Sequence, residues 1–226
     1  MVLKGRLRLI YDMIPRCDIL SDIGTDHALL PAYALLNGRC RKAIACDVRK
    51  GPLERAERTM MQYKLQDQME LRLGSGLEPL SPGEADCVVM AGMGGILITG
   101  LLNDSLSIAK KAKSIILQPM VGQELVRPFL WKNGFEADDE GLAREGEKLY
   151  QALSVHYTGE IRNGWAPVHE VIGEKLLAKR DPLLEDWIKD RTRRQEKIVK
   201  GLGAAQSAAG NLQKEEELLW AMRNLV

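Results

Sequence analysis

The chain has 226 residues, of which 45% belong to the hydrophobic set and 28% are charged, and its formal net charge is +1. This length and apolar content are enough for one α/β domain and a small additional unit. A net charge so near zero excludes a general polycation, so nucleic acid would have to be bound through local basic patches. The sequence has no run of about 18 apolar residues, so we expect no membrane-spanning helix.

Cysteine and histidine spacing argues against a metal site. The four cysteines form no CxxC pair, and His27, His156 and His169 are far apart in the chain. We therefore expect no bound metal, and we expect reduced, mostly buried thiols in a cytoplasmic protein. The basic start MVLKGRLRLIYDMIP lacks the unbroken apolar core of a signal peptide and instead predicts a short amphipathic helix.

Apolar runs and amphipathic segments alternate from the start of the chain to about residue 157. The expected helices are residues 1–15, 30–38, 51–65, 96–103 and 122–134. The expected strands are residues 17–24, 42–48, 69–76, 85–95 and 112–120, with a closing antiparallel pair at 135–146 and 148–157. Single helices between buried strands indicate an α/β fold with a mostly parallel, doubly wound sheet.

The pattern changes near residue 160. Seam residues step by four and three at Leu184, Ile188, Arg191, Gln195, Ile198 and Leu202 and, after Gly210-Asn211, at Leu212, Glu215, Leu219, Met222 and Val226. This spacing is typical of a helical hairpin or short coiled coil. We therefore expect a sheet domain of residues 1–160 and a small helical domain of residues 161–226.

The stretch ILSDIGTDHALLP, residues 19–31, places two acids and a histidine at the end of the first strand. Proline fits only the first turn of a helix, so Pro31 predicts a helix that begins around residues 28–30. Residues 24–27 are then a loop. Because ligands of open parallel sheets bind outside the carboxyl ends of the strands, we expect this loop to border a ligand crevice.

The residues at this crevice favour a cationic cofactor over a dinucleotide. A dinucleotide site needs GxGxxG, whereas the chain reads GTDHAL, with Asp26 in place of the second glycine. S-adenosylmethionine has a sulfonium cation and no phosphate, so carboxylates around it are favourable. The expected cofactor-binding residues are Asp22, Gly24, Thr25, Asp47, Val48, Ser75, Gly76 and Gly92.

Position in the fold suggests a role for several of these residues. Asp22 would lie near the amino group of the cofactor, and Gly24 would let the chain pass close to it. Asp47 ends the second strand and would accept hydrogen bonds from both ribose hydroxyls. Ser75 and Gly76 follow the third strand, where an adenine ring would lie. Singly, an acid at a strand end is more often a helix cap or a solvated residue. Together, and in this order, these residues favour a methyltransferase.

Five motifs of the chain are DIGTDHALLP, AIACDV, LRLGSGLEPL, VVMAGMGGILI and IILQPM. Through their combination the chain resembles the bacterial tRNA (adenine-22, N1) methyltransferases of the TrmK type. The resemblance covers about residues 3–226. It implies a class I Rossmann-like methyltransferase fold with a C-terminal coiled-coil domain, S-adenosyl-L-methionine as cofactor and tRNA as substrate. Ser75 departs from the family, which commonly has an acid there in a GDG setting, and its hydrogen bond to adenine would be weaker.

The reaction implied by this resemblance needs a carboxylate beside the base. Adenine N1 has an in-plane lone pair and needs no general base, but it must be free of its Watson–Crick partner. Methylation leaves a positive charge on the ring, which a carboxylate would stabilise. We expect Asp26 to be this catalytic carboxylate, unless it caps the following helix. His27 would take part in catalysis, orient Asp26, stack on the base or simply pack.

The glycine turn at residues 92–95 stands where base amino methyltransferases commonly have a polar-Pro-Pro-aromatic turn. The absence of the polar-Pro-Pro-aromatic turn favours a ring nitrogen over an exocyclic amine as the target. The glycines also indicate close approach of the backbone to cofactor or base. Gln118, at the end of the fifth strand, could line the same pocket.

Local basic clusters are candidates for phosphate contacts. The expected tRNA-binding residues are a helical stripe of Lys189, Arg193, Lys197 and Lys200 and the flanking Arg194. Further candidates are Lys4, Arg6 and Arg8 near the start and the strand-end pair Arg49 and Lys50. Acids nearly balance bases over residues 168–226, so the stripe could also be an ordinary solvated face. Aromatic residues make up 5% of the chain, so base stacking is not expected to dominate binding.

Two other functions remain open at this point, because one fold carries many activities. The chain could be a class I methyltransferase for a small molecule or protein, with the hairpin as a lid or dimerisation element. It could also be a non-catalytic RNA-binding module that retains the fold. The loop acids argue against a dead site, and the basic stripe argues against a small-molecule enzyme. We expect a monomer with no membrane partner.

Overall fold

The computed structural model describes residues 1–204 and 209–225. The chain divides into two compact units, Met1–Asn163 and Gly164–Val226. The sequence pattern placed this division near residue 160. Val226, the last residue of the expected seam, lies outside the described residues.

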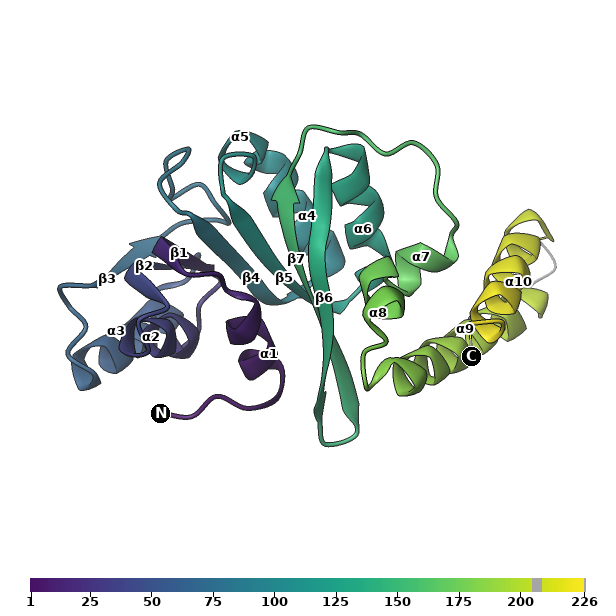
Figure 1. Ribbon diagram of the computed structural model, residues 1–226, viewed down its shortest axis with the longest axis horizontal. Coiled ribbons are helices and arrows are strands. Elements are labelled where there is room, and N and C mark those ends of the chain that lie inside the picture. Colours follow the sequence, from purple (N-terminus) through teal and green to yellow (C-terminus); the bar gives the residue numbers. More distant parts are fainter. Residues whose placement is uncertain (205–208, 226) are drawn as a thin grey trace. The chain divides into compact units, whose positions relative to one another are not determined.

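A seven-stranded sheet with the order β3-β2-β1-β4-β5-β7-β6 forms the centre of the first unit (Figure 1). The strands are β1 (Cys17–Ile23), β2 (Cys40–Asp47), β3 (Met69–Leu73), β4 (Cys87–Gly94), β5 (Ser114–Val121), β6 (Phe135–Glu145) and β7 (Lys148–Tyr157). The pairs among β1 to β5 are parallel, whereas β7 is antiparallel to β5 and to β6. The predicted mostly parallel α/β sheet with a closing antiparallel pair is therefore confirmed.

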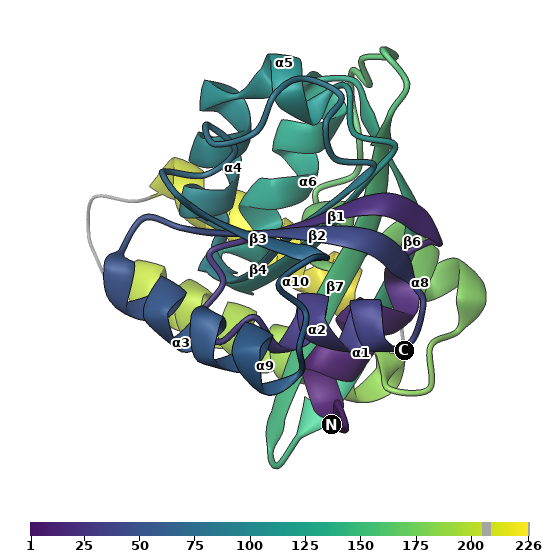
Figure 2. The ribbon, with the colours of Figure 1, turned by 90° about the vertical axis from the view of Figure 1, so that its left-hand side faces the viewer.

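Helices cover both faces of this sheet. They are α1 (Gly5–Met13), α2 (Leu29–Leu36), α3 (Lys50–Gln62), α4 (Gly95–Asp104), the short α5 (Leu106–Ala109) and α6 (Gln123–Lys132). Figure 2 shows α1, α2 and α3 below the sheet and α4, α5 and α6 above it. Each face has its own apolar core. Ile10, Leu35 and Ala56 lie in the first, whereas Ile98 and Val126 lie in the second.

The strand order reverses between β1 and β4. These two parallel strands are neighbours in the sheet, although two strands and two helices separate them in sequence. From β1 the order runs one way to β2 and β3, and from β4 it runs the other way to β5. Connections on either side of such a point leave on opposite faces, so a crevice opens at the carboxyl ends of β1 and β4.

The second unit is helical. It contains α7 (Val168–Val171), α8 (Glu174–Lys179), α9 (Leu184–Gly203) and α10 (Ala209–Arg223). Polar contacts between α9 and α10 include Gln195, whose amide nitrogen donates to the Glu215 carbonyl oxygen at 3.1 Å and to Glu215 Oε2 at 2.5 Å. They also include the ion pair of Arg223 with Glu196 at 2.7 Å. The predicted break at residues 210–211 is wrong, because α10 begins at Ala209 and includes both residues.

The helical hairpin is therefore present, and its classification as a coiled coil stays a prediction. Among the described helices, none is both long enough and apolar enough to cross a bilayer.

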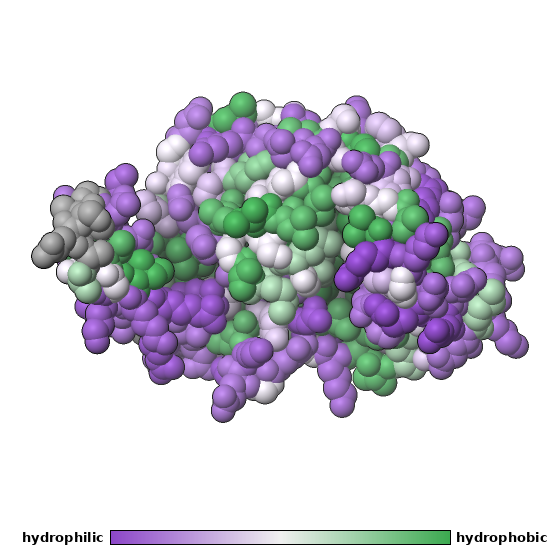
Figure 3. All heavy atoms as spheres, turned by 180° about the vertical axis from the view of Figure 1, so that it is seen from behind, coloured by the Kyte–Doolittle hydropathy of each residue, from purple (hydrophilic) through white to green (hydrophobic). Residues whose placement is uncertain are grey.

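Figure 3 shows apolar side chains gathered in the middle of one face, with hydrophilic side chains around them. Exposed apolar residues of the first unit include Ile96, Leu97 and Val121, where β4 and β5 lead into α4 and α6.

Candidate active site

Two buried acids lie at the carboxyl ends of neighbouring parallel strands. Asp22 on β1 is 8% exposed and Asp47 at the end of β2 is 7% exposed. Asp47 accepts a hydrogen bond from the Arg49 backbone N–H at 2.8 Å, and Arg49 Nε lies 3.6 Å from the same carboxylate oxygen. Asp22 forms no ion pair with any described residue. A pair of buried anions with so little positive charge nearby is suited to a cationic ligand.

The electrostatic state of Asp22 reflects this isolation. Burial raises the pKa of its carboxyl group from 3.8 to about 6, a hydrogen bond with Thr25 lowers it, and the charge of Asp47 raises it further. At neutral pH the side chain is therefore mainly ionised, although its surroundings disfavour the charge. A bound cation would remove that penalty.

The loop after β1 is fixed by backbone hydrogen bonds to β2. The N–H groups of Gly24 and Thr25 both donate to the Cys46 carbonyl oxygen, at 2.8 and 2.9 Å. Gly24 has φ +76°, and a Cβ there would overlap the methyl group of Met93. The glycine therefore allows the loop after β1 to lie against the turn after β4. Thr25 Oγ1 accepts the N–H of Ala28 at 3.1 Å and shapes the entry into α2.

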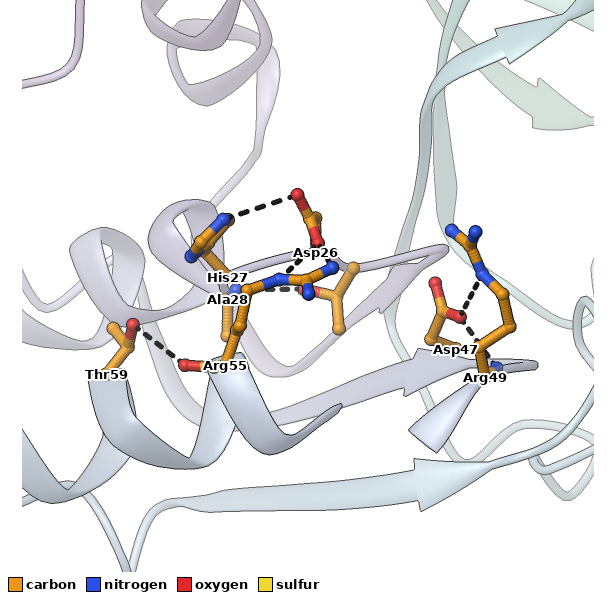
Figure 4. Close-up of polar contacts among 8 residues, drawn as sticks. Asp26, His27, Ala28, Asp47, Arg49, Arg55 and Thr59 are labelled. Atoms are coloured by element: carbon orange, nitrogen blue, oxygen red, sulfur yellow. Dashed lines mark hydrogen bonds and ion pairs between the residues drawn. The ribbon is translucent and has the colours of Figure 1, made fainter. Parts of the chain in front are cut away.

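Asp26 is held by a residue that the sequence did not reveal as functional. Arg55 of α3 donates to Asp26 Oδ1 from Nε at 2.9 Å and also from Nη2. His27 Nε2 lies 3.3 Å from Asp26 Oδ2. Figure 4 shows both groups directed at the carboxylate. The hydrogen bonds from Arg55 lower the pKa of Asp26.

The alternative role of Asp26 as a helix cap is excluded. The N-cap of α2 is Ala28, which has φ +49°, and no side chain caps this end of the helix. A non-glycine residue in this left-handed region is uncommon and typical of functional loops. In sequence, Arg55 belongs to the segment ERAER, which has the pattern of an ordinary solvated helix face. Only the placement of α3 beside the loop reveals its partner.

The ends of β2 and β3 form the next part of the crevice. The N–H of Gly74 donates to the Asp47 carbonyl oxygen at 3.1 Å, which brings Ser75 and Gly76 beside the end of β2. Gly76 has φ +52°, and a Cβ there would lie 2.8 Å from a Leu101 methyl group. Val48 is 63% exposed, so it offers an apolar surface next to Asp47.

The glycine turn after β4 is anchored to β5. Gly92 has φ +76°, and its N–H donates to Gln118 Oε1 at 3.1 Å. Gln118 was expected to line the pocket, but it is fully buried and instead supports the turn. A Cβ on Gly95 would overlap the Gly122 carbonyl group, so this position also requires glycine.

The structure thus brings most of the expected site residues to one edge of the sheet. They are Asp22, Gly24, Thr25, Asp26, His27, Asp47, Val48, Ser75, Gly76 and Gly92. Arg8 lies on α1, where its Nε donates to Asp12 at 2.9 Å. The expected tRNA-binding cations of α9 belong to the second unit and are exposed. The described part of the chain contains no group of three or more His, Cys, Asp or Glu residues that could hold a metal ion.

Comparisons with known proteins show which family the chain resembles. A family model described as a methyltransferase domain matches residues 3–153. The chain is 36% identical over 151 residues to the tRNA (adenine(22)-N(1))-methyltransferase of Bacillus subtilis (strain 168), a match that covers 67% of this chain and 63% of the relative. The chain thus spans less than two thirds of the length of this curated relative in the sequence alignment.

Two solved structures extend the similarity to nearly the whole chain. The crystal structure of the Bacillus subtilis m1A22 tRNA methyltransferase TrmK matches with a TM-score of 0.85 and 30% identity, over 99% of this chain and 97% of that one. A candidate tRNA (m1A22) methyltransferase of Streptococcus pneumoniae, in complex with S-adenosyl-L-methionine, matches with a TM-score of 0.81 and 27% identity, over 95% and 98% of the chains.

Proposed function

The chain belongs to the TrmK-type family of tRNA methyltransferases, and from this premise we propose that it transfers a methyl group from S-adenosyl-L-methionine to N1 of adenine 22 in the D-arm region of bacterial tRNA. The observation that supports this proposal most strongly is the pair of buried strand-end acids, Asp22 and Asp47, beside the exposed carboxylate of Asp26. The pair suits a cationic cofactor, and the third carboxylate suits a base that becomes cationic.

The residues present fit S-adenosyl-L-methionine. Asp22 would hold its ammonium group, and Asp47 would accept hydrogen bonds from the ribose hydroxyls. Gly24 and Thr25 would let the backbone pass close to its amino acid end. Val48 would pack on the adenine ring, and Ser75 and Gly76 would border the ring edge. When bound, the cofactor supplies an electrophilic methyl group, whose transfer to N1 moves a positive charge from sulfur to the target ring.

Asp26 and His27 would act on the target base. Asp26 lies beyond the cofactor acid on the same loop, and its side chain is 62% exposed, so an entering base can reach it. Its lowered pKa keeps it ionised at neutral pH. The carboxylate would stabilise the positive charge that develops on the adenine ring and can accept a proton from the exocyclic amine. His27 would orient Asp26 or stack on the base.

Exposed cations would hold the tRNA backbone. On α9, Lys189 pairs with Glu185, and Arg194 Nε lies 3.1 Å from Asp190. Arg193 and Lys197 have no ion-pair partner among the described residues, so their charges are free for phosphates. Arg8 on α1 would add a further contact. The assignment of residues 1–160 to catalysis and of 161–226 to tRNA contact is part of this proposal, and the cytoplasmic location and monomeric state stay predictions.

The reaction can be tested with labelled S-adenosyl-L-methionine and two tRNA transcripts that differ only in adenine or guanine at position 22. We expect 1-methyladenosine, identified by mass spectrometry of the nucleosides, from the adenine transcript alone. Label in both transcripts would contradict the assigned position. Label in neither, with cofactor binding intact, would favour an enzyme for a small molecule or protein, or a non-catalytic RNA-binding module.

A further inference from the structure

We propose that Arg6, in the first turn of α1, binds a phosphate of the target nucleotide, and that Glu145 and Gln118 position it beside the glycine turn after β4. This inference rests on the function proposed above and adds a substrate-binding residue to the same site.

Arg6 is fixed to the sheet by contacts with segments that are distant in sequence. Its backbone N–H donates to Glu145 Oε1 at 2.8 Å. Gly5, with φ +53°, has no side chain to obstruct this approach, and a Cβ there would overlap the Glu145 side chain. The Arg6 guanidinium lies 5.9 Å from the centre of the Tyr150 ring. The start of α1 is therefore docked against β6 and β7.

The guanidinium reaches the glycine turn. Arg6 Nη1 lies 3.5 Å from Gln118 Oε1 and 3.6 Å from the position that a Cβ would occupy on Gly92. The same Gln118 oxygen accepts the Gly92 N–H at 3.1 Å, and the Gln118 amide nitrogen donates to the Pro119 carbonyl oxygen at 3.2 Å. One fully buried amide thus links the arginine to the turn. These hydrogen bonds satisfy the buried amide and hold its oxygen between the turn and the guanidinium.

This turn adjoins the loop that carries Asp26. Met93, the residue after Gly92, places its methyl group against Gly24, two residues before Asp26. Arg6 and Asp26 are therefore connected through the contact between two neighbouring strand ends. If Asp26 acts on the target base as proposed above, the guanidinium would border the place where that base enters.

The free donors of Arg6 favour an anion. Its side chain is 30% exposed, and its polar contacts within the described residues are the one to Gln118 at 3.5 Å and one to Glu145 at 3.9 Å. A guanidinium has five N–H donors in a planar fork that matches phosphate oxygens. Methylation at N1 makes the adenine ring positive, so a cation is unfavourable against the ring itself. The anionic group of the target nucleotide that the Arg6 guanidinium can bind is therefore its phosphate.

The test compares Arg6→Gln and Arg6→Lys with a matched control, Arg41→Gln. Arg41 is exposed at the start of β2, at the opposite edge of the sheet, and pairs there with Asp18 at 2.8 Å. For each protein, kcat and KM for a tRNA transcript are measured over a range of salt concentrations, together with the melting temperature and the affinity for S-adenosyl-L-methionine.

For Arg6→Gln we expect kcat/KM for tRNA to fall roughly 10- to 100-fold, as expected for a charged hydrogen bond. The slope of log kcat/KM against log salt concentration should become less negative by about 0.7 to 0.9, which corresponds to the loss of one phosphate contact. Arg6→Lys keeps the charge and should keep the wild-type slope with a smaller fall in kcat/KM. Arg41→Gln should match the wild type in both quantities.

Two results would overturn the assignment of Arg6 while leaving the proposed reaction intact. One is wild-type kcat/KM and slope in Arg6→Gln. The other is a fall in kcat/KM with an unchanged salt slope and a lowered melting temperature and cofactor affinity, which would indicate a structural role only. If the wild-type protein itself does not methylate tRNA, the proposed function fails and the Arg6 inference fails with it.

Discussion

At the amino ends of the parallel strands, Asp86 accepts the backbone N–H groups of Asp18 and Ile19 at 2.9 and 3.0 Å and pairs with Lys113 at 2.8 Å. At the carboxyl ends of the same strands, Asp22 is more deeply buried and forms no ion pair with any described residue. The pKa of Asp86 is lowered by its hydrogen bond to Lys113, whereas burial raises the pKa of Asp22 to about 6.

The presence of a cavity does not by itself mark the ligand site. A cavity of about 730 Å³ lies at the amino edge and is lined by Asp18, Asp86 and Lys113 among others. Its acids are already neutralised by hydrogen bonds and ion pairs, so they contribute to stability. At the carboxyl ends of the strands, Asp22 is buried without an ion-pair partner in the described part of the chain, and burial raises its pKa to about 6. A buried charge without a partner is thus the better indicator of a ligand site.

The largest effect is expected from Asp26→Ala at the carboxyl edge. Loss of the carboxylate beside the base should lower kcat at least about 100-fold. The affinity for S-adenosyl-L-methionine, measured by calorimetry, should stay within about twofold of wild type. Near-normal turnover in a variant that still binds the cofactor would remove Asp26 from the mechanism.

Asp22→Asn should separate binding from stability. Removing the carboxylate should weaken cofactor binding by roughly tenfold or more. The unfolding free energy without ligand should rise by up to about 3 kcal/mol, because a buried charge is removed whose pKa is raised from 3.8 to about 6. The folded state binds more protons between these values, so the wild type loses stability as pH rises through this window. Denaturant titration measures this change. A lower unfolding free energy in Asp22→Asn than in the wild type would contradict the claim that the buried Asp22 charge destabilises the ligand-free protein.

Asp86→Ala should behave in the opposite way. Two backbone N–H groups and Lys113 would lose their acceptor, so the unfolding free energy should fall by about 1 to 3 kcal/mol. Cofactor affinity should be unchanged. Because the folded-state pKa of Asp86 is lowered below 3.8, the wild-type advantage is present above about pH 4 and disappears as pH falls through the folded-state pKa. A weakened cofactor site in a stable Asp86→Ala protein would show that the amino edge also serves binding.

The smallest effect is expected from Lys113→Gln. The lysine side chain is 80% exposed, and exposed ion pairs contribute little to stability. Asp86 would keep its two backbone donors, so the melting temperature should change less than in Asp86→Ala. A larger change in Lys113→Gln would mean that the ion pair, and not the backbone hydrogen bonds, stabilises this edge.

Much of the carboxyl edge was predictable because it depends on chain order. A strand that ends in Asp22 and a neighbouring parallel strand that ends in Asp47 must bring both acids to one edge. Pro31 located the start of α2, which is Leu29 in the structure. The contacts between distant segments were not predictable. The approach of Met93 to Gly24 and of Gly122 to Gly95 depends on how strands and helices pack.

Side-chain partners were the least predictable feature. Arg55 has no sequence signal, because charged residues on a helix such as α3 are usually solvated. Gln118 looked like a pocket residue because of its place near the end of an apolar strand, yet its side chain is buried and accepts the Gly92 N–H. Both depend on the position of a second segment that the local pattern does not contain.

The most direct test of the unpaired acid at the carboxyl edge is a carbon NMR titration of the Asp22 carboxyl group, with and without S-adenosyl-L-methionine. The prediction is a pKa of about 6 in the free protein and a clear decrease when the cationic cofactor binds. A pKa near 3.8 in the free protein, or a value that the cofactor leaves unchanged, would contradict it.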